Sequence, residues 1–201
     1  MRDSNKEARI GRSCSPSGKA CQAGASRKCS ESMRTPFPVA LFCLAAGPAA
    51  LAEESVTLVE NGESVATIVL SAEARPAEQW AASEFAAAVA AMSGAETPIV
   101  TYDGTLPDPA VVIGPGPHLD AAGVSLDPGT LGGEGYRIVA RDGVLAIAGI
   151  GERGSMYGVF DVLHGLGCRW WTPRESHIPE MATITIPPTD RTSRPAFAYR
   201  D

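Results

Sequence analysis

Apolar and polar residues alternate from residue 55 to residue 71, where the sequence reads SVTLVENGESVATIVLS. Alternation with a period of two is typical of strands that bury one face. Asn61-Gly62 interrupts the run, and this dipeptide is a strong signal for a two-residue hairpin turn. The segments 135–141 and 143–149, GYRIVAR and GVLAIAG, repeat the pattern around Asp142-Gly143. The chain is therefore predicted to contain two β-hairpins.

Two other segments follow the helical period. Pro76 suits the first turn of a helix and Gly94 suits its end, so a helix is predicted between them. Its apolar residues fall on one face and are Ala81, Phe85, Ala88, Val89 and Met92. A second helix is predicted over about residues 155–166. The residues of its apolar stripe are Met156, Val159, Phe160, Leu163 and Leu166.

The remaining β-rich runs are short and are bounded by Gly or Pro, namely PIVTY, AVVIGPG, CRWW and ATITIP. Residues 118–133 are predicted to be a loop, and residues 191–201, RTSRPAFAYRD, show no periodicity. Two helices among short strands and hairpins indicate an α+β fold. We expect a two-layer sandwich, in which a mixed sheet carries two main helices packed on it.

Residues 33–52 have the pattern of a secretory signal peptide. Arg34 gives a short positive start, residues 36–50 are mostly apolar, and Ala50-Leu51-Ala52 is a cleavage signal of the A-x-A type. The apolar run is too short for a stable membrane anchor and contains three prolines. We therefore expect cleavage after Ala52 and a secreted or periplasmic protein.

Residues 1–32 differ in composition from the rest of the chain. They contain every lysine of the sequence and three of its five cysteines. These residues are Lys6, Lys19, Lys28, Cys14, Cys21 and Cys29. The cysteines lack paired C-x-x-C spacing and nearby histidines, so they do not indicate a metal site. We interpret this segment as the result of a start codon assigned too early, or as a disordered leader.

The charge balance shifts once the signal peptide is set aside. The whole chain has 17 basic and 23 acidic residues, and eight of the basic but three of the acidic ones precede residue 53. A domain this acidic repels phosphate backbones, so nucleic acid is excluded as a partner. Cys168 is the only cysteine after residue 52. The domain, assigned to residues 53–194, is therefore expected to fold on its core without a disulfide.

The segment Gly149–Gly154 reads GIGERG and matches the dinucleotide-binding pattern G-x-G-x-x-G. It follows a predicted strand and precedes a predicted helix, as that loop does. However, the strand belongs to a hairpin, and no alternating βαβ order surrounds it, as a nucleotide-binding fold requires. We favour the simpler interpretation that the glycines let a helix start tightly against a sheet.

No catalytic residue, metal site or cofactor is predicted. The histidines at 118, 164 and 177 have no zinc-ligand spacing. Asp161 and His164 lie three residues apart on the second helix, with Cys168 nearby, so a Cys-His nucleophile is one interpretation. A helix-surface pair beside a buried structural cysteine is the favoured one. Nothing places two carboxylates on either side of a substrate, as glycoside hydrolysis requires.

Trp170 and Trp171 are the most informative residues of the chain. Adjacent residues of a strand point to opposite faces, so we expect one indole in the core against the second helix and the other outward. We take Trp171 as the outward one, with Arg169 or Arg174 nearby. An outward indole suits a sugar face or a neighbouring domain. Burial of both rings stays open as the alternative.

Several segments together resemble a known domain. They are PAEQWAASEFAAAVAAMSGAETPIV, AVVIGPG, GERGSMYGVFDVLHGLGCRWWTPRESHIPE and ITIPPTDRTSRPAFAYRD. They look like the N-terminal domain that precedes the catalytic barrel in α-glucuronidases and related secreted hydrolases, and in bacterial β-hexosaminidases. The resemblance covers about residues 56–201. Its most specific part is the pattern RG-x-x-YG-V-x-x-x-L-x-x-x-G-x-RW from Arg153 to Trp170.

The resemblance implies a non-catalytic accessory domain of an exported glycoside hydrolase. In the family, a P-x-F-x-x-R stretch leads into the barrel, and Pro195, Phe197 and Arg200 match it. Residues 195–201 would thus begin a linker into a catalytic barrel that this sequence lacks, and the family's catalytic carboxylates lie on that barrel. The edge with Arg169 to Arg174 would face the barrel or a carbohydrate. The alternatives are a stand-alone carbohydrate-binding module and, less favoured, a nucleotide-binding protein.

Overall fold

The computed structural model describes residues 54–172, 174–194 and 196. The predicted leader, the signal peptide, and Pro195, Phe197 and Arg200 lie outside these residues. The described elements, in chain order, are β1 (Val56–Glu60), β2 (Glu63–Ser64), β3 (Thr67–Leu70), α1 (Pro76–Ser93), β4 (Ile99–Thr101), β5 (Ala110–Ile113), α2 (Pro117–Ala121), α3 (Pro128–Leu131), β6 (Tyr136–Arg141), β7 (Val144–Gly149), α4 (Gly154–Gly165), β8 (Arg169–Thr172), β9 (Glu175–His177), β10 (Ile184–Ile186) and β11 (Thr189–Ser193).

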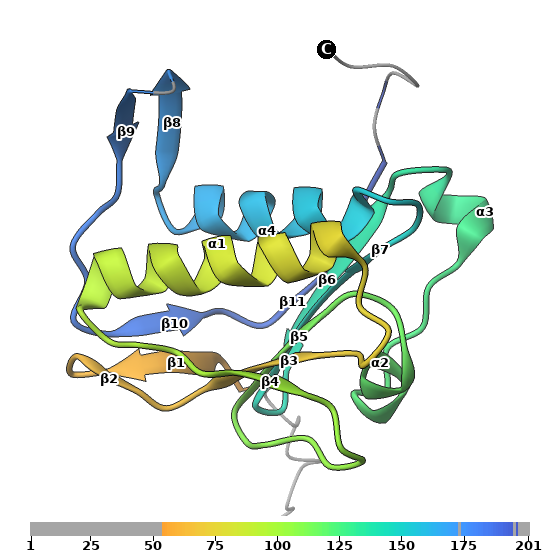
Figure 1. Cartoon of the computed structure of the whole chain (residues 1–201), viewed down its shortest axis with the longest axis horizontal. Helices are drawn as coiled ribbons and strands as arrows, with labels where there is room; N and C mark the ends of the chain where they lie inside the picture. Colours follow the sequence, from red (N-terminus) through yellow and green to blue (C-terminus); the bar gives the residue numbers. More distant parts are fainter. Residues whose placement is uncertain (1–53, 173, 195, 197–201) are drawn as a thin grey trace, which may run out of the picture. The chain divides into compact units, whose positions relative to one another are not determined.

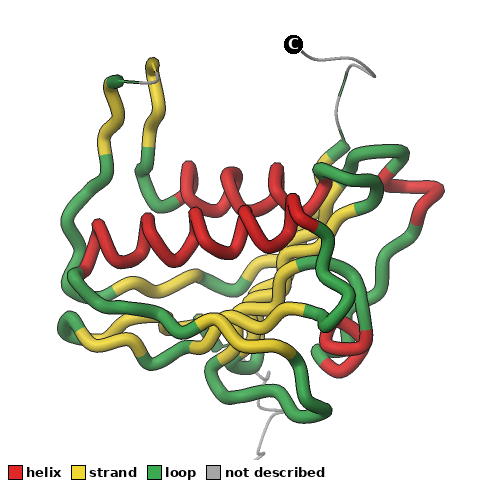
Figure 2. The backbone as a smooth tube through the Cα atoms, in the orientation of Figure 1, coloured by secondary structure: helices red, strands yellow, loops and turns green. Residues whose placement is uncertain are grey.

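A six-stranded mixed sheet forms the centre of the domain (Figure 2). Its strand order is β11-β6-β7-β5-β3-β4. The strands β7, β5, β3 and β4 are parallel to one another, whereas β6 runs antiparallel to both β7 and β11. The sheet is mixed and carries two main helices, so the predicted α+β fold class is confirmed.

The two long helices α1 and α4 lie side by side on one face of this sheet (Figure 1). The strands alternate, and every second residue points to these helices. The strand residues in this helix-facing core are Ile68, Leu70, Val111, Ile113, Ile138, Ala140, Leu145 and Ile147. The helices contribute the predicted face of α1, including the fully buried Phe85, and Val159 and Leu163 of α4. Burial of each large apolar side chain stabilises the fold by about 1.5–3 kcal/mol.

The opposite face of the sheet forms a second, smaller core. The strand residues that alternate with those of the first core point to this opposite face. Val69, Val112 and Val139 are among them. Leu119 of α2 and Val124 cover them. The prediction of a loop over residues 118–133 is therefore wrong in part, because the short helices α2 and α3 begin or lie there. Helices of four or five residues are too short to show an apolar period.

Local signals set the ends of α1 as predicted. Pro76 is at the first position, and the side chain of Glu78, two residues later, reaches back to the capping residue Arg75. The Arg75 backbone N–H donates to Glu78 Oε2 at 2.8 Å, and Arg75 Nε donates to Glu78 Oε1 at 2.9 Å. Gly94 ends the helix in the left-handed region, with a φ of 78°. Glycine adopts this conformation without strain.

Both predicted hairpins are present, and each turns on two residues with positive φ. These are Asn61 and Gly62 between β1 and β2, and Asp142 and Gly143 between β6 and β7. The first hairpin is shorter than predicted, because the chain leaves it after Ser64 and enters the main sheet as β3. The β1 strand instead pairs with β10, and together they extend the core under the helices.

Candidate functional site

The predicted site residues Arg169, Trp170, Trp171 and Arg174 all belong to one small hairpin. Strands β8 and β9 pair only with each other and extend away from the helical layer (Figure 1). Every residue of both strands is exposed, including Trp170 at 38% and Trp171 at 62%. The expectation that one indole is buried is therefore wrong. The β8–β9 hairpin packs on neither of the two larger sheets, so both of its faces are open to solvent. Trp171 is the more exposed of the two, as predicted.

The two indoles have different neighbours. Trp170 leans on α4, with its ring centroid 5.3 Å from Phe160 in an edge-on arrangement and 5.7 Å from His164. On the far side of Phe160, the half-exposed Trp80 of α1 lies 5.7 Å away. These four residues are called the aromatic surface below. Trp171 stands beyond it, with its centroid 6.4 Å from His177 of β9.

The two arginines have separate roles in the hairpin. Arg169 Nη1 donates to the backbone carbonyls of His164 and Cys168, both at 2.7 Å. The guanidinium therefore binds carbonyls at the C-terminal end of α4, which a cation stabilises. Arg174 lies in the turn between β8 and β9 and is exposed. The hairpin thus presents Trp171 and Arg174 to solvent, while Arg169 and Trp170 join it to α4.

A hollow that the sequence did not reveal adjoins the aromatic surface. It has a volume of about 320 Å³ and lies between β6, α4 and the chain that follows β11. Its lining residues are Tyr136, Tyr157, Phe160, Asp161, His164, Ser193, Arg194 and Ala196. Asp161 and His164 were noted in the sequence, but as partners of Cys168. That thiol is fully buried, and burial raises its pKa, which argues against a reactive nucleophile.

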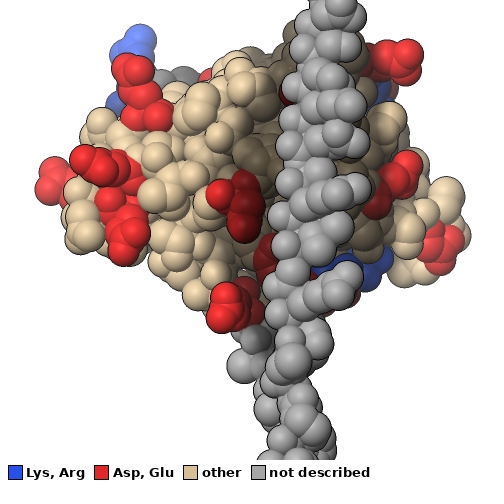
Figure 3. Space-filling view, turned by 90° about the horizontal axis from the view of Figure 1, so that it is seen from below, with Lys and Arg blue, Asp and Glu red and all other residues tan. Residues whose placement is uncertain are grey.

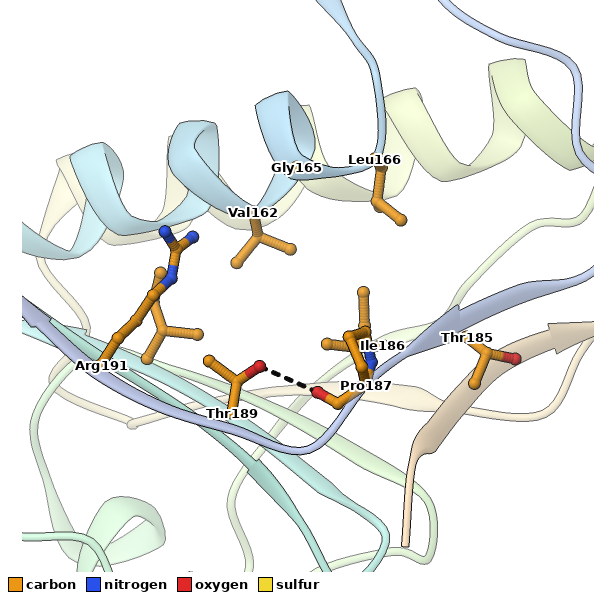
Figure 4. Close-up of a pocket in the computed structure, with 9 residues that line it drawn as sticks. Val162, Gly165, Leu166, Thr185, Ile186, Pro187, Thr189 and Arg191 are labelled. Atoms are coloured by element: carbon orange, nitrogen blue, oxygen red, sulfur yellow. Dashed lines mark hydrogen bonds between the residues drawn. The ribbon is translucent and has the colours of Figure 1, made fainter.

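A second cavity, an apolar cleft of about 440 Å³, lies between α4 and the passage from β10 to β11 (Figure 4). Val162, Leu166 and Ile186 point into it, and Arg191 stands at one end. Thr189 Oγ1 donates to the carbonyl of Pro187 at 3.0 Å, so this hydroxyl is already satisfied within the cleft wall. Arg191 Nη2 contacts Asp161 Oδ2 at 3.0 Å, and this ion pair separates the cleft from the hollow.

The glycines of Gly149–Gly154 are packed against other backbone segments. A Cβ on Gly149 would overlap the backbone of Gly154, and one on Gly154 would lie 2.7 Å from the carbonyl oxygen of Gly135. Arg75 Nη1 donates to the carbonyl of Gly151. The loop thus serves as a close junction between β7 and α4, which agrees with the simpler interpretation of its sequence.

The described residues contain no group of three or more His, Cys, Asp or Glu side chains that is arranged to hold a metal ion. Among the same residues, no helix combines the length and apolar character needed to cross a membrane. Acidic side chains are spread over the face seen from below (Figure 3).

No protein-family model matches the sequence, and no curated protein matches it. Solved structures do resemble the fold. A family GH115 4-O-methyl-α-glucuronidase with specificity for decorated arabinogalactans has a TM-score of 0.53 at 19% identity, over 68% of this chain and 18% of that one. A Streptomyces plicatus β-hexosaminidase has a TM-score of 0.43 at 16% identity, over 76% of this chain and 26% of that one. A family GH138 enzyme that targets pectin rhamnogalacturonan II has a TM-score of 0.33 at 14% identity, over 58% of this chain and 12% of that one.

The likeness to the GH115 enzyme extends to the fold and no further, because the identity is 19%. The chain spans less than a fifth of the length of that enzyme. The domain therefore has a fold that also occurs as one part of a glycoside hydrolase.

Proposed function

We propose that this chain is the non-catalytic N-terminal accessory domain of an exported, α-glucuronidase-like glycoside hydrolase. In this proposal the domain packs against a carbohydrate-cleaving barrel and holds it in place. The fold shared with a GH115 4-O-methyl-α-glucuronidase supports the assignment. The acidic surface gives no reason to propose nucleic acid as a partner.

The observation that carries the proposal is the position of the exposed aromatic rings. The rings of Trp80, Phe160 and Trp170 contact one another in succession across α1, α4 and β8, with Trp80 and Trp170 exposed and Phe160 partly buried, and Trp171 follows Trp170 on the same hairpin. Large exposed apolar side chains gathered on one face are characteristic of an interaction surface. Trp is also among the residues that contribute most to protein interfaces.

The path of the chain leads to the same face. Ser193 at the end of β11, and Arg194 and Ala196 after it, line the hollow together with Phe160 and His164 of α4. The last described residues thus lie beside Phe160 and His164 of the aromatic surface. Proximity of this kind favours an intramolecular interface, because a short connection gives a high effective concentration.

The proposal is tested with the downstream gene segment. The reading frame after Asp201 is expected to encode a (β/α)₈ barrel of about 250 residues. Expressed as a separate polypeptide, that barrel should bind the purified chain, and both Trp170→Ala and Trp171→Ala should weaken the complex. Val100→Ala is the matched control, since Val100 is an exposed apolar residue of β4, outside the aromatic surface. Equal effects of the three variants would contradict docking through this surface.

The chain alone is expected to lack hydrolase activity. The proposal places the acid and the nucleophile that glycoside hydrolysis uses on the barrel. Turnover of an aryl glucuronide or an aryl N-acetylhexosaminide by the purified chain would overturn the non-catalytic assignment.

A second candidate is a stand-alone carbohydrate-binding module. The observation in its favour is the open Trp171 indole, exposed at 62% on a hairpin that also bears Arg174. An exposed indole can pack on the apolar face of a sugar ring. Under this candidate, the chain without a barrel retards on polysaccharide affinity gels, and Trp171→Ala abolishes the retardation.

A further inference from the structure

The hollow next to the aromatic surface combines aromatic faces with fixed hydrogen-bonding groups. Tyr157 and Phe160 contribute rings from α4, while Asp161, Ser193 and Arg194 contribute polar groups. Polar atoms predominate in its lining. A purely apolar ligand would leave these groups without partners, at a cost in free energy. The lining therefore favours a ligand that has both hydroxyl groups and an apolar face.

Asp161 is the best-ordered acceptor in the hollow. Tyr136 Oη donates to Asp161 Oδ2 at 2.8 Å, and Arg191 Nη2 contacts the same oxygen at 3.0 Å. Both contacts reach the same carboxylate oxygen. Burial raises the pKa of Tyr136, and a hydrogen bond from the Ser193 hydroxyl lowers it by a smaller amount, so the phenol donates to Asp161 and accepts from Ser193. These contacts hold the carboxylate in one orientation, and an ionised carboxylate can accept several hydrogen bonds in all.

The other polar groups complement this acceptor. The Arg194 guanidinium has several donors, and the Ser193 hydroxyl, which donates to Tyr136, can still accept a hydrogen bond. The hydroxyl groups of one ligand can therefore donate to Asp161 and accept from Arg194. Carboxylate and guanidinium carry opposite charges, so the hollow does not select strongly for an anion or a cation.

We propose that this hollow binds one pyranose ring of a carbohydrate. A pyranose presents hydroxyl groups along its edge for Asp161, Ser193 and Arg194, and a C–H face for Tyr157 or Phe160. The volume of about 320 Å³ lies at the lower end of the range for small-molecule sites, which fits a single ring. The inference rests on the second candidate function, because both assign carbohydrate binding to this chain. The site it names is the hollow and not Trp171. It does not require a barrel.

Saturation-transfer NMR on the purified chain tests this site. The probes are methyl β-glucopyranoside, methyl β-galactopyranoside, N-acetylglucosamine and, as an acyclic control, sorbitol. We expect at least one pyranose to receive saturation and to bind with a millimolar dissociation constant, and sorbitol to receive none. Absence of transfer to every pyranose, or equal transfer to sorbitol, would overturn the proposal.

Two pairs of variants locate the binding. Asp161→Ala and Arg194→Ala should each weaken pyranose binding about tenfold or more, which is 1.4 kcal/mol per factor of ten. Asp190→Ala is the matched control, because Asp190 lies on the same strand as Arg191 but pairs with Arg137 outside the hollow. Trp171→Ala should also leave binding unchanged. Loss in Trp171→Ala with retention in Asp161→Ala would assign sugar binding to the hairpin and refute the hollow, while leaving barrel docking untouched.

Asp161→Ala is compatible with a folded domain. Its partner Arg191 is 47% exposed, so loss of the carboxylate leaves that guanidinium in contact with water. Circular dichroism of each variant verifies the fold. Should Asp161→Ala not fold, Arg194→Ala gives the same answer, since Arg194 is exposed and lines the same hollow.

Discussion

Trp170 meets Phe160 edge to face, with an interplanar angle of 79° and 5.3 Å between the ring centroids. This side-chain contact joins β8 to α4, while the backbone of β8 pairs with β9. Edge-to-face aromatic pairs contribute about 0.5–1.5 kcal/mol beyond their buried area. The contact therefore holds the β8–β9 hairpin in position while most of the Trp171 ring stays in solvent.

The two tryptophans should accordingly differ in their effect on stability. Trp170→Ala removes the contacts with Phe160 and His164 and is expected to lower the free energy of unfolding by about 1–2 kcal/mol. Trp171→Ala should change it by no more than about 0.5 kcal/mol, as exposed substitutions do. Urea unfolding followed by circular dichroism measures both. Equal losses would show that Trp171 also packs against the domain.

Two glycines of α4 offer a matched pair of substitutions. A Cβ on Gly158 would lie 2.7 Å from Ile147 Cγ2 and 3.2 Å from Tyr136 Cδ2, whereas one on Gly165 would meet nothing within 4 Å. Gly158→Ala should therefore destabilise the domain by about 1–3 kcal/mol through overpacking. Gly165→Ala should stabilise it by up to about 1 kcal/mol, because alanine favours the helix. Thermal unfolding of the two variants measures both effects. A lower melting temperature for Gly165→Ala than for the original chain would contradict the expected stabilisation.

Cys168 should be unreactive in the folded domain. Its side chain is fully buried at the end of α4, and burial raises the pKa of its thiol. Only the thiolate reacts with disulfide reagents, and burial suppresses it. In a chain begun at residue 53, which has no other cysteine, a colorimetric disulfide reagent should label the thiol only after denaturant is added. Rapid labelling without denaturant would revive the Cys-His interpretation.

Features with a local cause could be predicted from the sequence. The turns at Asn61-Gly62 and Asp142-Gly143 and the ends of α1 depend on residues within a few positions, and all of them are present. The strand β11 was missed, because its residues TDRTS have no apolar alternation. This segment is a strand because it pairs with β6, and that pairing is not visible in the pattern of its own residues.

The candidate site could not be predicted from the sequence, because it depends on tertiary contacts. Alternation in β8 places adjacent residues on opposite sides, but whether either side is buried depends on what covers the hairpin. The hollow brings together Tyr136, Asp161 and Ser193 from three elements that are separated along the chain. No spacing motif joins such residues, so the sequence showed Asp161 only as a neighbour of His164.

The ion pair between β6 and β11 predicts a dependence of stability on pH. Arg137 Nε and Nη2 donate to the two carboxylate oxygens of Asp190 at 2.9 and 2.7 Å. Hydrogen bonds from this guanidinium lower the pKa of Asp190 below its ordinary value of 3.8, against a smaller opposing effect of burial. A carboxyl group with a lower pKa in the folded state stabilises the fold at pH values above the unfolded pKa. This stabilisation is lost as the pH falls through the folded-state pKa.

Asp190→Asn tests this dependence. Near neutral pH the variant should be less stable than the original chain by about 0.2–1 kcal/mol, the range for exposed ion pairs. The difference should shrink as the pH falls below 3.8, because the original carboxyl then becomes neutral as well. Glu60→Gln, an exposed carboxylate at the end of β1, is the control for general charge effects. A difference between Asp190→Asn and the original chain that stays constant from pH 7 to pH 2 would show that Arg137 does not hold Asp190 through its charge.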